Sequence, residues 1–505
     1  MKMIFGKNPI WPDWSGKEVS DLKQQRFRFK LIALLLGGLL ILAGAYGVRS
    51  VTQYGGRWFS YAANPRLALL KSQVLEGDIM DRSGLLLATT QDGNRVFAED
   101  PEVREALVHV VGDGQGMVAN AVETFHAGYL YGYSSSLPDA LSHLINPDEP
   151  RRGNDITLTI DALLSKSIPA AFEAHPLTKG KSGAAVVMNY LTGEILALVS
   201  LPSFDPTSQR IDLDNALDHP YFNRATQARL PPGSTFKIIT SAAALARLKD
   251  ADTRRFTCSG FLPVSDTFTV MDFGKAVHGS LTLRQAFLRS CNSVYASLAL
   301  EMGDTVLRGE AERFGFNRNF LFRDLVVYNS SYPKEPQSRE ALAASGYGQS
   351  AITATPLHLC LISAAIARGG TLPEPRLLLR VTSSRGTPVL SFSSTEAGTV
   401  CASDVASRLS EMMKAVVQEG GSGASAAVTT LDIRGKTGTA VSSVDGRTVN
   451  YGWFTGFSAQ KDMPVSLCVL VEDISDGETG GSTSAIIAHD IFAYLKAHPA
   501  LISGL

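Results

Sequence analysis

The longest apolar stretch of the chain runs from Leu31 to Val48 and contains no charged residue. A helix of this length spans roughly 27 Å, close to the apolar thickness of a bilayer. Before it stand seven basic residues against three acidic ones, a bias that favours a cytoplasmic N-terminus. We therefore expect a cytoplasmic tail over 1–30, one transmembrane anchor over 31–48 and an extracytoplasmic remainder. A cleaved signal peptide is the alternative, because Ala43-Gly44-Ala45 resembles a cleavage site, but the segment before the apolar stretch is long for one.

Short apolar pieces mixed with Gly, Asp and Asn follow the anchor. Val74 to Thr89 predicts two strands around a turn at Asp81–Gly84. This part of the chain contains no group of residues typical of catalysis. We expect a smaller, β-rich and non-catalytic domain over 49–155, with a structural or partner-binding role.

From residue 156 to the end, strand and helix patterns predict one large α/β domain. Ile156–Ile160 alternates as a strand, and Asp161 can cap the helix after it. Gly183–Ser200 predicts a hairpin around Asn189–Gly193. The later patterns are helical at 281–303, 356–368 and 484–497, and strand-like at 433–440, 451–458 and 465–471. Because strands at both ends enclose the helices, we expect a sheet whose edges come from distant sequence.

Composition narrows the classes of function. A chain of 505 residues is long enough for two or three domains. The formal net charge of −1 gives no indication of nucleic-acid binding. Five cysteines are scattered without a Cys-x-x-Cys pair, so the spacing indicates neither a disulfide framework nor a zinc site.

The most unusual local pattern is Leu230–Leu245, where a Pro-Pro-Gly break precedes an almost wholly apolar run. It predicts a loop that leads into a buried helix. Ser234 would lie in the first turn, and Lys237 would follow one turn later on the same face. A lysine with a lowered pKa can take the proton of a serine hydroxyl and activate it as a nucleophile. The pattern therefore indicates a candidate acylation centre.

Two further motifs decide how much weight this one carries, because Ser-x-x-Lys also occurs at Ser20, Ser331 and Ser458. Ser290-Cys291-Asn292 lies between two helical patterns, where a plain helix cap is the alternative interpretation. Lys436-Thr437-Gly438-Thr439 lies in a short strand pattern, where the alternative is an edge strand with a glycine bulge. Small residues here would let a substrate backbone approach, and the threonine hydroxyls can bind a carboxylate.

Ser-x-x-Lys, Ser-x-Asn and Lys-Thr-Gly, in this order, resemble the motifs of penicillin-binding proteins and serine β-lactamases. Longer segments share the resemblance: NRATQARLPPGSTFK, GYGQSAITATPLHL, GKTGTA and GDIMDRSGLLLA. The likeness extends from about residue 64 to the end and is greatest for class B penicillin-binding proteins, of the shorter type with a reduced N-terminal pedestal. It implies a transpeptidase domain over 156–505, with an antiparallel sheet flanked by helices, a pedestal over 49–155 and one transmembrane helix.

The resemblance also implies a role for each residue of the first two motifs. Ser234 would be the nucleophile that becomes acylated, and Lys237 the base that receives its proton. Ser290 would pass a proton to the leaving amine, and Asn292 would hold the substrate amide. The same resemblance implies that no metal or organic cofactor is needed.

In the third motif, Lys436 would add positive charge, which keeps Lys237 neutral. Thr437, Gly438 and Thr439 would form the substrate-binding strand, with the two hydroxyls on the terminal carboxylate of the donor peptide. The backbone N–H groups of Ser234 and Thr439 would form the oxyanion hole.

The expected function is that of a bacterial, membrane-anchored D,D-transpeptidase that cross-links peptidoglycan stem peptides ending in D-Ala-D-Ala. β-Lactams would acylate the same serine. The family also implies a polytopic membrane glycosyltransferase as partner. A D,D-carboxypeptidase or β-lactamase is the first alternative, and a non-catalytic scaffold or β-lactam sensor is the second, against which the complete motifs argue.

Overall fold

The structure is a computed structural model that describes residues 17–59, 74–132, 151–208, 219–391, 393–418, 420–444 and 446–502. Contacts within the chain divide it after Trp58 into two units. The first contains α1 (Lys17–Phe59), in which Arg26–Val48 is long and apolar enough to cross a membrane. None of that stretch is buried against other parts of the protein. The predicted anchor over 31–48 lies within it.

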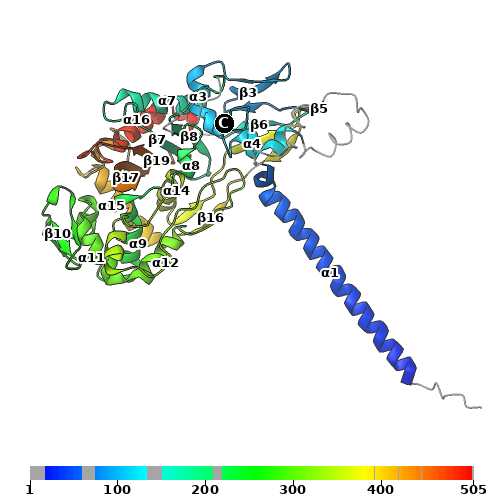
Figure 1. Cartoon of the computed structure of the whole chain (residues 1–505), viewed down its shortest axis with the longest axis horizontal. Coiled ribbons are helices and arrows are strands. Elements are labelled where there is room, and N and C mark those ends of the chain that lie inside the picture. The colour runs from blue at the N-terminus through cyan, green and yellow to red at the C-terminus, as the bar shows by residue number, and fades with distance from the viewer. Residues whose placement is uncertain are drawn as a thin grey trace, which may run out of the picture. The chain divides into compact units, whose positions relative to one another are not determined.

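An antiparallel five-stranded sheet forms the centre of the second unit (Figure 1). Its strand order is β17-β18-β19-β7-β8, so the edges come from opposite ends of the domain, as the sequence predicted. The strands are β7 (Gly183–Asn189), β8 (Ile195–Leu201), β17 (Ile433–Val444), β18 (Arg447–Ser458) and β19 (Val465–Glu472). The predicted hairpin over 183–200 is confirmed as β7 and β8.

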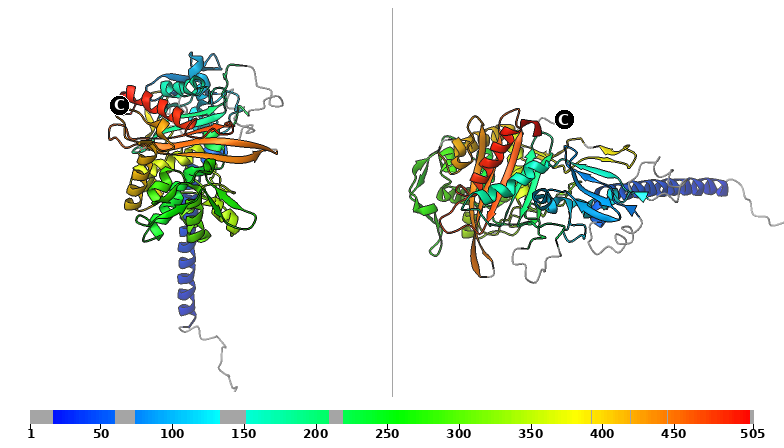
Figure 2. Two further views of the ribbon diagram at one scale, coloured as in Figure 1. Left: turned by 90° about the vertical axis from the view of Figure 1, so that its left-hand side faces the viewer. Right: turned by 90° about the horizontal axis from the view of Figure 1, so that it is seen from above.

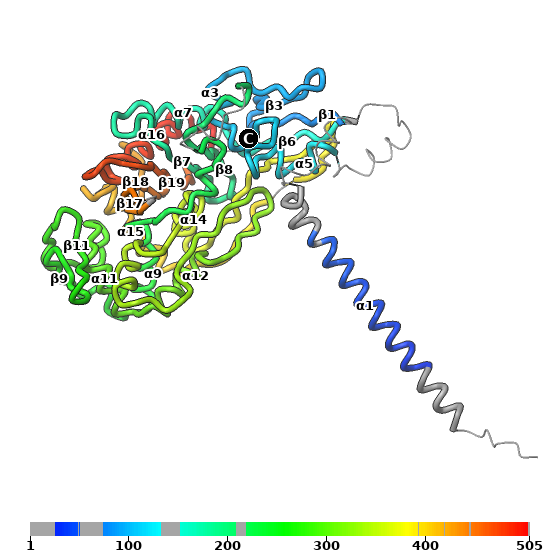
Figure 3. Tube along the Cα trace, viewed as in Figure 1, coloured from blue at the N-terminus to red at the C-terminus, as the bar shows by residue number. Residues whose placement is uncertain are grey.

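Helices cover both faces of this sheet. Alternate residues of β7 pack into two different cores, with Val186 in one and Val187 in the other. On the face of Val187 lie α7 (Ala162–Ala174) and α16 (Ser484–Ala497), which are far apart in sequence and adjacent in space (Figure 3). On the face of Val186 lie α14 (Pro356–Ala367) and α9 (Lys237–Arg247).

The hairpin of β17 and β18 is longer than its neighbours. Tyr451 is the first residue of β18 that pairs with β19, so residues 441–444 and 447–450 of the hairpin extend past the rest of the sheet (Figure 2). β17 is an edge strand of the described sheet, because β18 is its single neighbour there. The Lys436–Thr439 motif lies on that edge.

A second sheet joins segments from both sides of the domain boundary that we predicted at residue 155. Its order is β15-β14-β6-β2-β3-β4. The strands are β2 (Ile79–Met80), β3 (Leu86–Gln91), β4 (Asn94–Phe97), β6 (Asp155–Leu158), β14 (Leu378–Thr382) and β15 (Pro388–Ser391). The predicted turn at Asp81–Gly84 is confirmed, with the Asp81 carboxylate accepting from the N–H of Leu85 at 2.9 Å. The division at 155 itself stays a prediction.

Several helix ends follow the local rules read from the sequence. Asp161 caps α7, because its carboxylate accepts from the N–H of Leu164 at 2.8 Å. The helical pattern over 281–303 is confirmed as α10 (Leu283–Leu288) and α11 (Asn292–Met302), which are separated by a break at Ser290 and Cys291.

The remaining described elements are shorter or peripheral. The helices are α3 (Pro101–Val111), α4 (Val122–Phe125), α5 (Ala127–Leu130), α8 (Arg224–Gln227), α12 (Asp304–Arg313), α13 (Arg339–Ser345) and α15 (Ser403–Gln418), with 3₁₀ turns η1 (Gly233–Phe236), η2 (Phe273–Lys275), η3 (Ala424–Ala426) and η4 (Pro499–Leu501). The strands are β1 (Val74–Leu75), β5 (Arg151–Arg152), β9 (Phe256–Cys258), β10 (Phe261–Pro263), β11 (Thr269–Met271), β12 (Gly279–Leu281), β13 (Thr371–Pro373) and β16 (Glu396–Thr399).

Candidate active site

The turn that carries Ser234 packs directly against the edge strand of the sheet. Gly233 has a φ of +52°, and a Cβ there would lie 2.4 Å from the carbonyl oxygen of Thr439. Only glycine fits both the backbone conformation and the space. The indole N–H of Trp453 in β18 donates to the carbonyl of Pro231 at 3.0 Å and fixes the loop from the other side. Two of the three motifs are therefore in backbone contact.

Ser234 and Lys237 are one turn apart, but the first turn is not α-helical as we predicted. Ser234 lies in η1, and α9 begins only at Lys237, whose N–H bonds to the carbonyl of Ser234. This i→i+3 bond is the tighter 3₁₀ geometry that often starts a helix. Ser234 is half-buried and faces the cavity, whereas Lys237 has no exposed surface.

The amine of Lys237 joins the first motif to the second. Its Nζ donates to the carbonyl oxygen of Ser290 at 2.6 Å, to the Ser290 hydroxyl at 3.1 Å and to Oδ1 of Asn292 at 2.8 Å. Among the described residues, Lys237 Nζ makes no hydrogen bond to the Ser234 side chain. The spacing of Ser-x-x-Lys alone would have suggested a direct contact between the two side chains.

Lys436 reaches the same serine from the opposite side. Its Nζ donates to the Ser290 hydroxyl at 3.1 Å and to the carbonyl of Thr437 at 3.2 Å, and it is also fully buried. The Ser290 hydroxyl thus lies between two lysine amines. One hydroxyl in contact with both amines is a short path along which a proton can move.

Burial shifts the pKa values of both lysines downward. It lowers the pKa of Lys237 from 10.5 to about 7. It also lowers the pKa of Lys436 well below 10.5, and the charge of Lys237 adds to this effect. Two adjacent ammonium groups are therefore disfavoured at neutral pH. Which of the two lysines carries the charge is not fixed by these pKa directions, so the positive charge that we expected on Lys436 stays a prediction.

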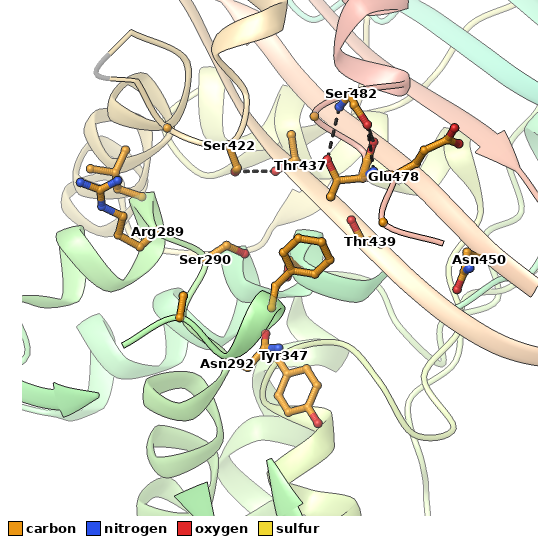
Figure 4. A pocket seen from close by; sticks show the side chains of 18 of the residues that line it. Arg289, Ser290, Asn292, Tyr347, Ser422, Thr437, Thr439, Asn450, Glu478 and Ser482 are labelled. Atoms are coloured by element: carbon orange, nitrogen blue, oxygen red, sulfur yellow. Dashed lines mark hydrogen bonds between the residues drawn. The ribbon is translucent and has the colours of Figure 1, made fainter. Parts of the chain in front are cut away.

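A cavity of about 870 Å³ opens above the three motifs. Ser234, Ser290, Asn292, Thr437 and Thr439 line it, while Lys237 and Lys436 lie behind its wall. Figure 4 shows Ser290, Asn292, Thr437 and Thr439 among the side chains that line it. Asn450 of β18 also lines it, and further lining side chains come from loops: Arg289, Tyr347, Gln349, Ser422, Asp476, Glu478 and Ser482.

Ser422 is a lining residue that the sequence analysis missed. Its hydroxyl lies 2.5 Å from the Thr437 hydroxyl, so the two form one pair of hydrogen-bonding groups on the cavity wall (Figure 4). Thr439 is held in turn by the N–H of Gly480, which donates to its hydroxyl at 3.2 Å. Ser422 lies in a glycine-rich loop with no motif of its own, so the sequence offered no signal for it.

Gly438 lies where β17 meets the turn that carries Ser234. A Cβ at this position would lie 2.7 Å from the carbonyl of Pro232 and 3.0 Å from the methyl group of Thr235. The missing side chain therefore makes room for the turn that carries Ser234. The expected approach of a substrate backbone at Gly438 stays a prediction. Gly438 contributes to the site by letting β17 and η1 pack closely.

A group of side chains that can act as metal ligands, which the spacing did not reveal, lies behind the Ser290–Asn292 turn. Donor atoms of Cys258, Asp272, His278 and Cys291 all lie within 4.8 Å of one another. Two thiols, an imidazole and a carboxylate are ligands of the kind that zinc takes, so these residues can hold such an ion. They come from separate segments, and sequence spacing therefore shows no metal motif. The expectation that the reaction itself uses no metal stays a prediction.

The fold and the cavity together define a candidate serine acyl-transfer site. Residues 183–493 match the penicillin-binding protein transpeptidase domain. The chain is 34% identical over 378 residues to the peptidoglycan D,D-transpeptidase PbpA of Mycobacterium tuberculosis, covering 70% of this chain and 74% of that protein. It is 28% identical over 404 residues to the peptidoglycan D,D-transpeptidase MrdA of Acinetobacter baumannii, covering 72% of this chain and 57% of that one.

Solved structures agree with these relatives. Penicillin-binding protein A from M. tuberculosis, as a ceftriaxone acyl-enzyme complex, superposes with a TM-score of 0.75 at 28% identity, covering 84% of this chain and 98% of that one. The chain belongs to the penicillin-binding protein transpeptidase family, in its class B branch. The resemblance read from the motifs is thereby confirmed.

Proposed function

We propose that this protein is a membrane-anchored peptidoglycan D,D-transpeptidase that works through an acyl-enzyme on Ser234. The observation that carries the proposal is the position of Ser234 at the cavity, next to the buried Lys237–Ser290–Lys436 chain of hydrogen bonds. The names and acyl-enzyme structures of the relatives support the reaction class.

In the acylation step, Oγ of Ser234 attacks the carbonyl carbon of the D-Ala-D-Ala bond. Its proton passes to the neutral amine of Lys237, whose pKa near 7 suits a base at neutral pH. The N–H groups of Ser234 and Thr439 bind the oxyanion, with a contribution of about 3 kcal/mol per donor. The C–N bond then breaks, and the leaving amine of D-Ala takes a proton from the Ser290 hydroxyl. The Lys237 ammonium replaces that proton on Ser290 and becomes neutral again.

The hydroxyl pair of Thr437 and Ser422, together with Thr439, supplies donors for the terminal carboxylate of the donor peptide. β-Lactams carry a carboxylate at a similar distance from their reactive carbonyl, so the same contacts would orient them. In the second step, the amine of a neighbouring stem peptide attacks the ester on Ser234. Its proton returns through the lysine chain, and the serine is regenerated.

Product analysis separates this function from D,D-carboxypeptidase activity, in which water replaces the acceptor amine. The purified protein is incubated with a stem pentapeptide donor and an acceptor peptide with a free amine, and the products are weighed by mass spectrometry. We expect release of one D-Ala per cross-linked product. If the tetrapeptide with a free carboxyl group is the main product at saturating acceptor, water is the acceptor. The protein is then a carboxypeptidase, and the proposed transpeptidase function is wrong.

The orientation of the anchor is also part of the proposal, because the basic residues before the apolar stretch favour a cytoplasmic N-terminus. The catalytic domain would then face peptidoglycan, where a polytopic glycosyltransferase could act beside it.

We expect protein extracted from membranes to retain residues 1–48. Mass spectrometry of the intact protein tests this, and a mature N-terminus near Tyr46 would contradict the retained anchor.

A further inference from the structure

Asp272 lies directly behind the Ser290–Asn292 turn and belongs to none of the three motifs. It follows β11 and is only 3% exposed. A buried carboxylate is costly unless hydrogen bonds compensate for the lost water. The hydrogen bonds that Asp272 accepts therefore indicate its structural role.

One oxygen of Asp272 holds the backbone at the start of α11. Oδ1 accepts a short hydrogen bond from the N–H of Asn292 and a second one, at 3.3 Å, from the N–H of Ser293. The other oxygen accepts from the hydroxyl of Ser293 at 2.5 Å and from the thiols of Cys258 at 3.2 Å and Cys291 at 3.6 Å. All five donors are thus fixed by a single carboxylate.

The turn needs this support. The first N–H groups of a helix have no partner inside it, and the residue before α11, Cys291, provides no side-chain cap. Asp272 supplies the cap from another segment. Ser290 has a φ of +54°, a conformation that a serine keeps only where its surroundings enforce it.

A carboxylate also suits this end of α11. The first N–H groups of a helix point outward from its N-terminus, where an acidic side chain is favoured.

We propose that Asp272 is a positioning residue for the reaction, because it fixes Ser290 and Asn292 at the amine of Lys237. The three acceptors of that amine are the carbonyl and hydroxyl of Ser290 and Oδ1 of Asn292. Asn292 is the link between the two sets of contacts, since its N–H is held by Asp272 while its side chain accepts from Lys237. The amide of Asn292 also donates to Met271, next to Asp272, at 3.0 Å. The inference rests on the proposed function.

Three substitutions at Asp272 separate position from charge. Asp272→Asn keeps an oxygen that accepts the two N–H bonds but removes the charge. Asp272→Glu keeps the charge but moves the carboxylate by one methylene. Asp272→Ala removes both. We expect the rate constant for acylation by a β-lactam to fall about 100-fold in Asp272→Ala and at least tenfold in Asp272→Glu. In Asp272→Asn it should fall less than tenfold. The reason is that small displacements of reacting groups have large effects on rate.

Asp161→Ala is the matched control. Asp161 is also 3% exposed and caps a helix, but α7 contributes no residue to the cavity. It should lower the melting temperature as Asp272→Ala does, with an unchanged acylation rate. In the Asp272 variants, the acylation rate constant should fall more than the apparent affinity of the non-covalent β-lactam complex, which places the larger effect in the chemical step.

Two results would overturn the inference: Asp272→Glu acylating at the wild-type rate, or Asp272→Asn as slow as Asp272→Ala. If Asp272→Ala does not fold, the comparison of Asn with Glu still decides. Wild-type protein that is not acylated at all would instead refute the proposed function, so the two failures are distinguishable.

Discussion

Replacing Ser234 by alanine is expected to abolish covalent labelling by penicillin and leave the fold intact. The Ser234 hydroxyl is the atom that would form the bond to the β-lactam carbonyl. It is half-buried and faces the cavity, so its loss removes little packing. Labelling with a fluorescent penicillin, followed on a denaturing gel, measures the result, and a thermal melt checks the fold.

A second serine in the same segment provides the control for this experiment. Ser241 in α9 is buried, and its hydroxyl lies 2.6 Å from that of Tyr295. Ser241→Ala therefore removes a hydroxyl from the helix that follows Ser234 without removing the nucleophile, and it should still be labelled. Labelling of Ser234→Ala at wild-type stoichiometry would show that another residue is the nucleophile.

Lys237→Arg is expected to be nearly as damaging as Lys237→Ala, each with a loss of at least about a hundredfold in acylation, the lower end for a general base. If Lys237 acts as a neutral base, keeping its charge does not help. Arginine cannot lose its proton in a protein. The larger guanidinium must also fit a site with no exposed surface, where the amine already has three partners. Acylation rates of the purified variants measure the effect.

The pH dependence of the acylation rate is a second test of Lys237 as the base. Burial lowers the pKa of Lys237 to about 7, so the neutral form increases as pH rises through 7. The wild-type acylation rate should rise over that range, whereas the residual rate of Lys237→Arg should not. An arginine variant that acylates within a few-fold of wild type would transfer the base role to another group.

Local patterns in the sequence predicted those parts of the fold that local forces determine. The hairpin over 183–200, the Asp161 cap and the last helix over 484–497 all depend on neighbours within a few residues, and all are present. Pairing between distant strands was different. β6 joins β14 across more than two hundred residues, and no periodicity in either strand specifies its partner.

The candidate site shows the same limit. The resemblance identified the motifs, but not the contacts among them. Lys237 bonds to Ser290 and Asn292, which lie more than fifty residues away in sequence, and the spacing of Ser-x-x-Lys does not specify these partners. Asp272 and Ser422 reach the site from segments without a motif. Their roles depend on tertiary packing, which spacing along the chain does not encode.

Mapping the acylated residue tests the central claim most directly. The full-length protein is incubated with penicillin and digested, and the peptides are sequenced by mass spectrometry. The account predicts one adduct per chain, carried by Ser234. An adduct on any other residue, with Ser234 unmodified, would contradict it.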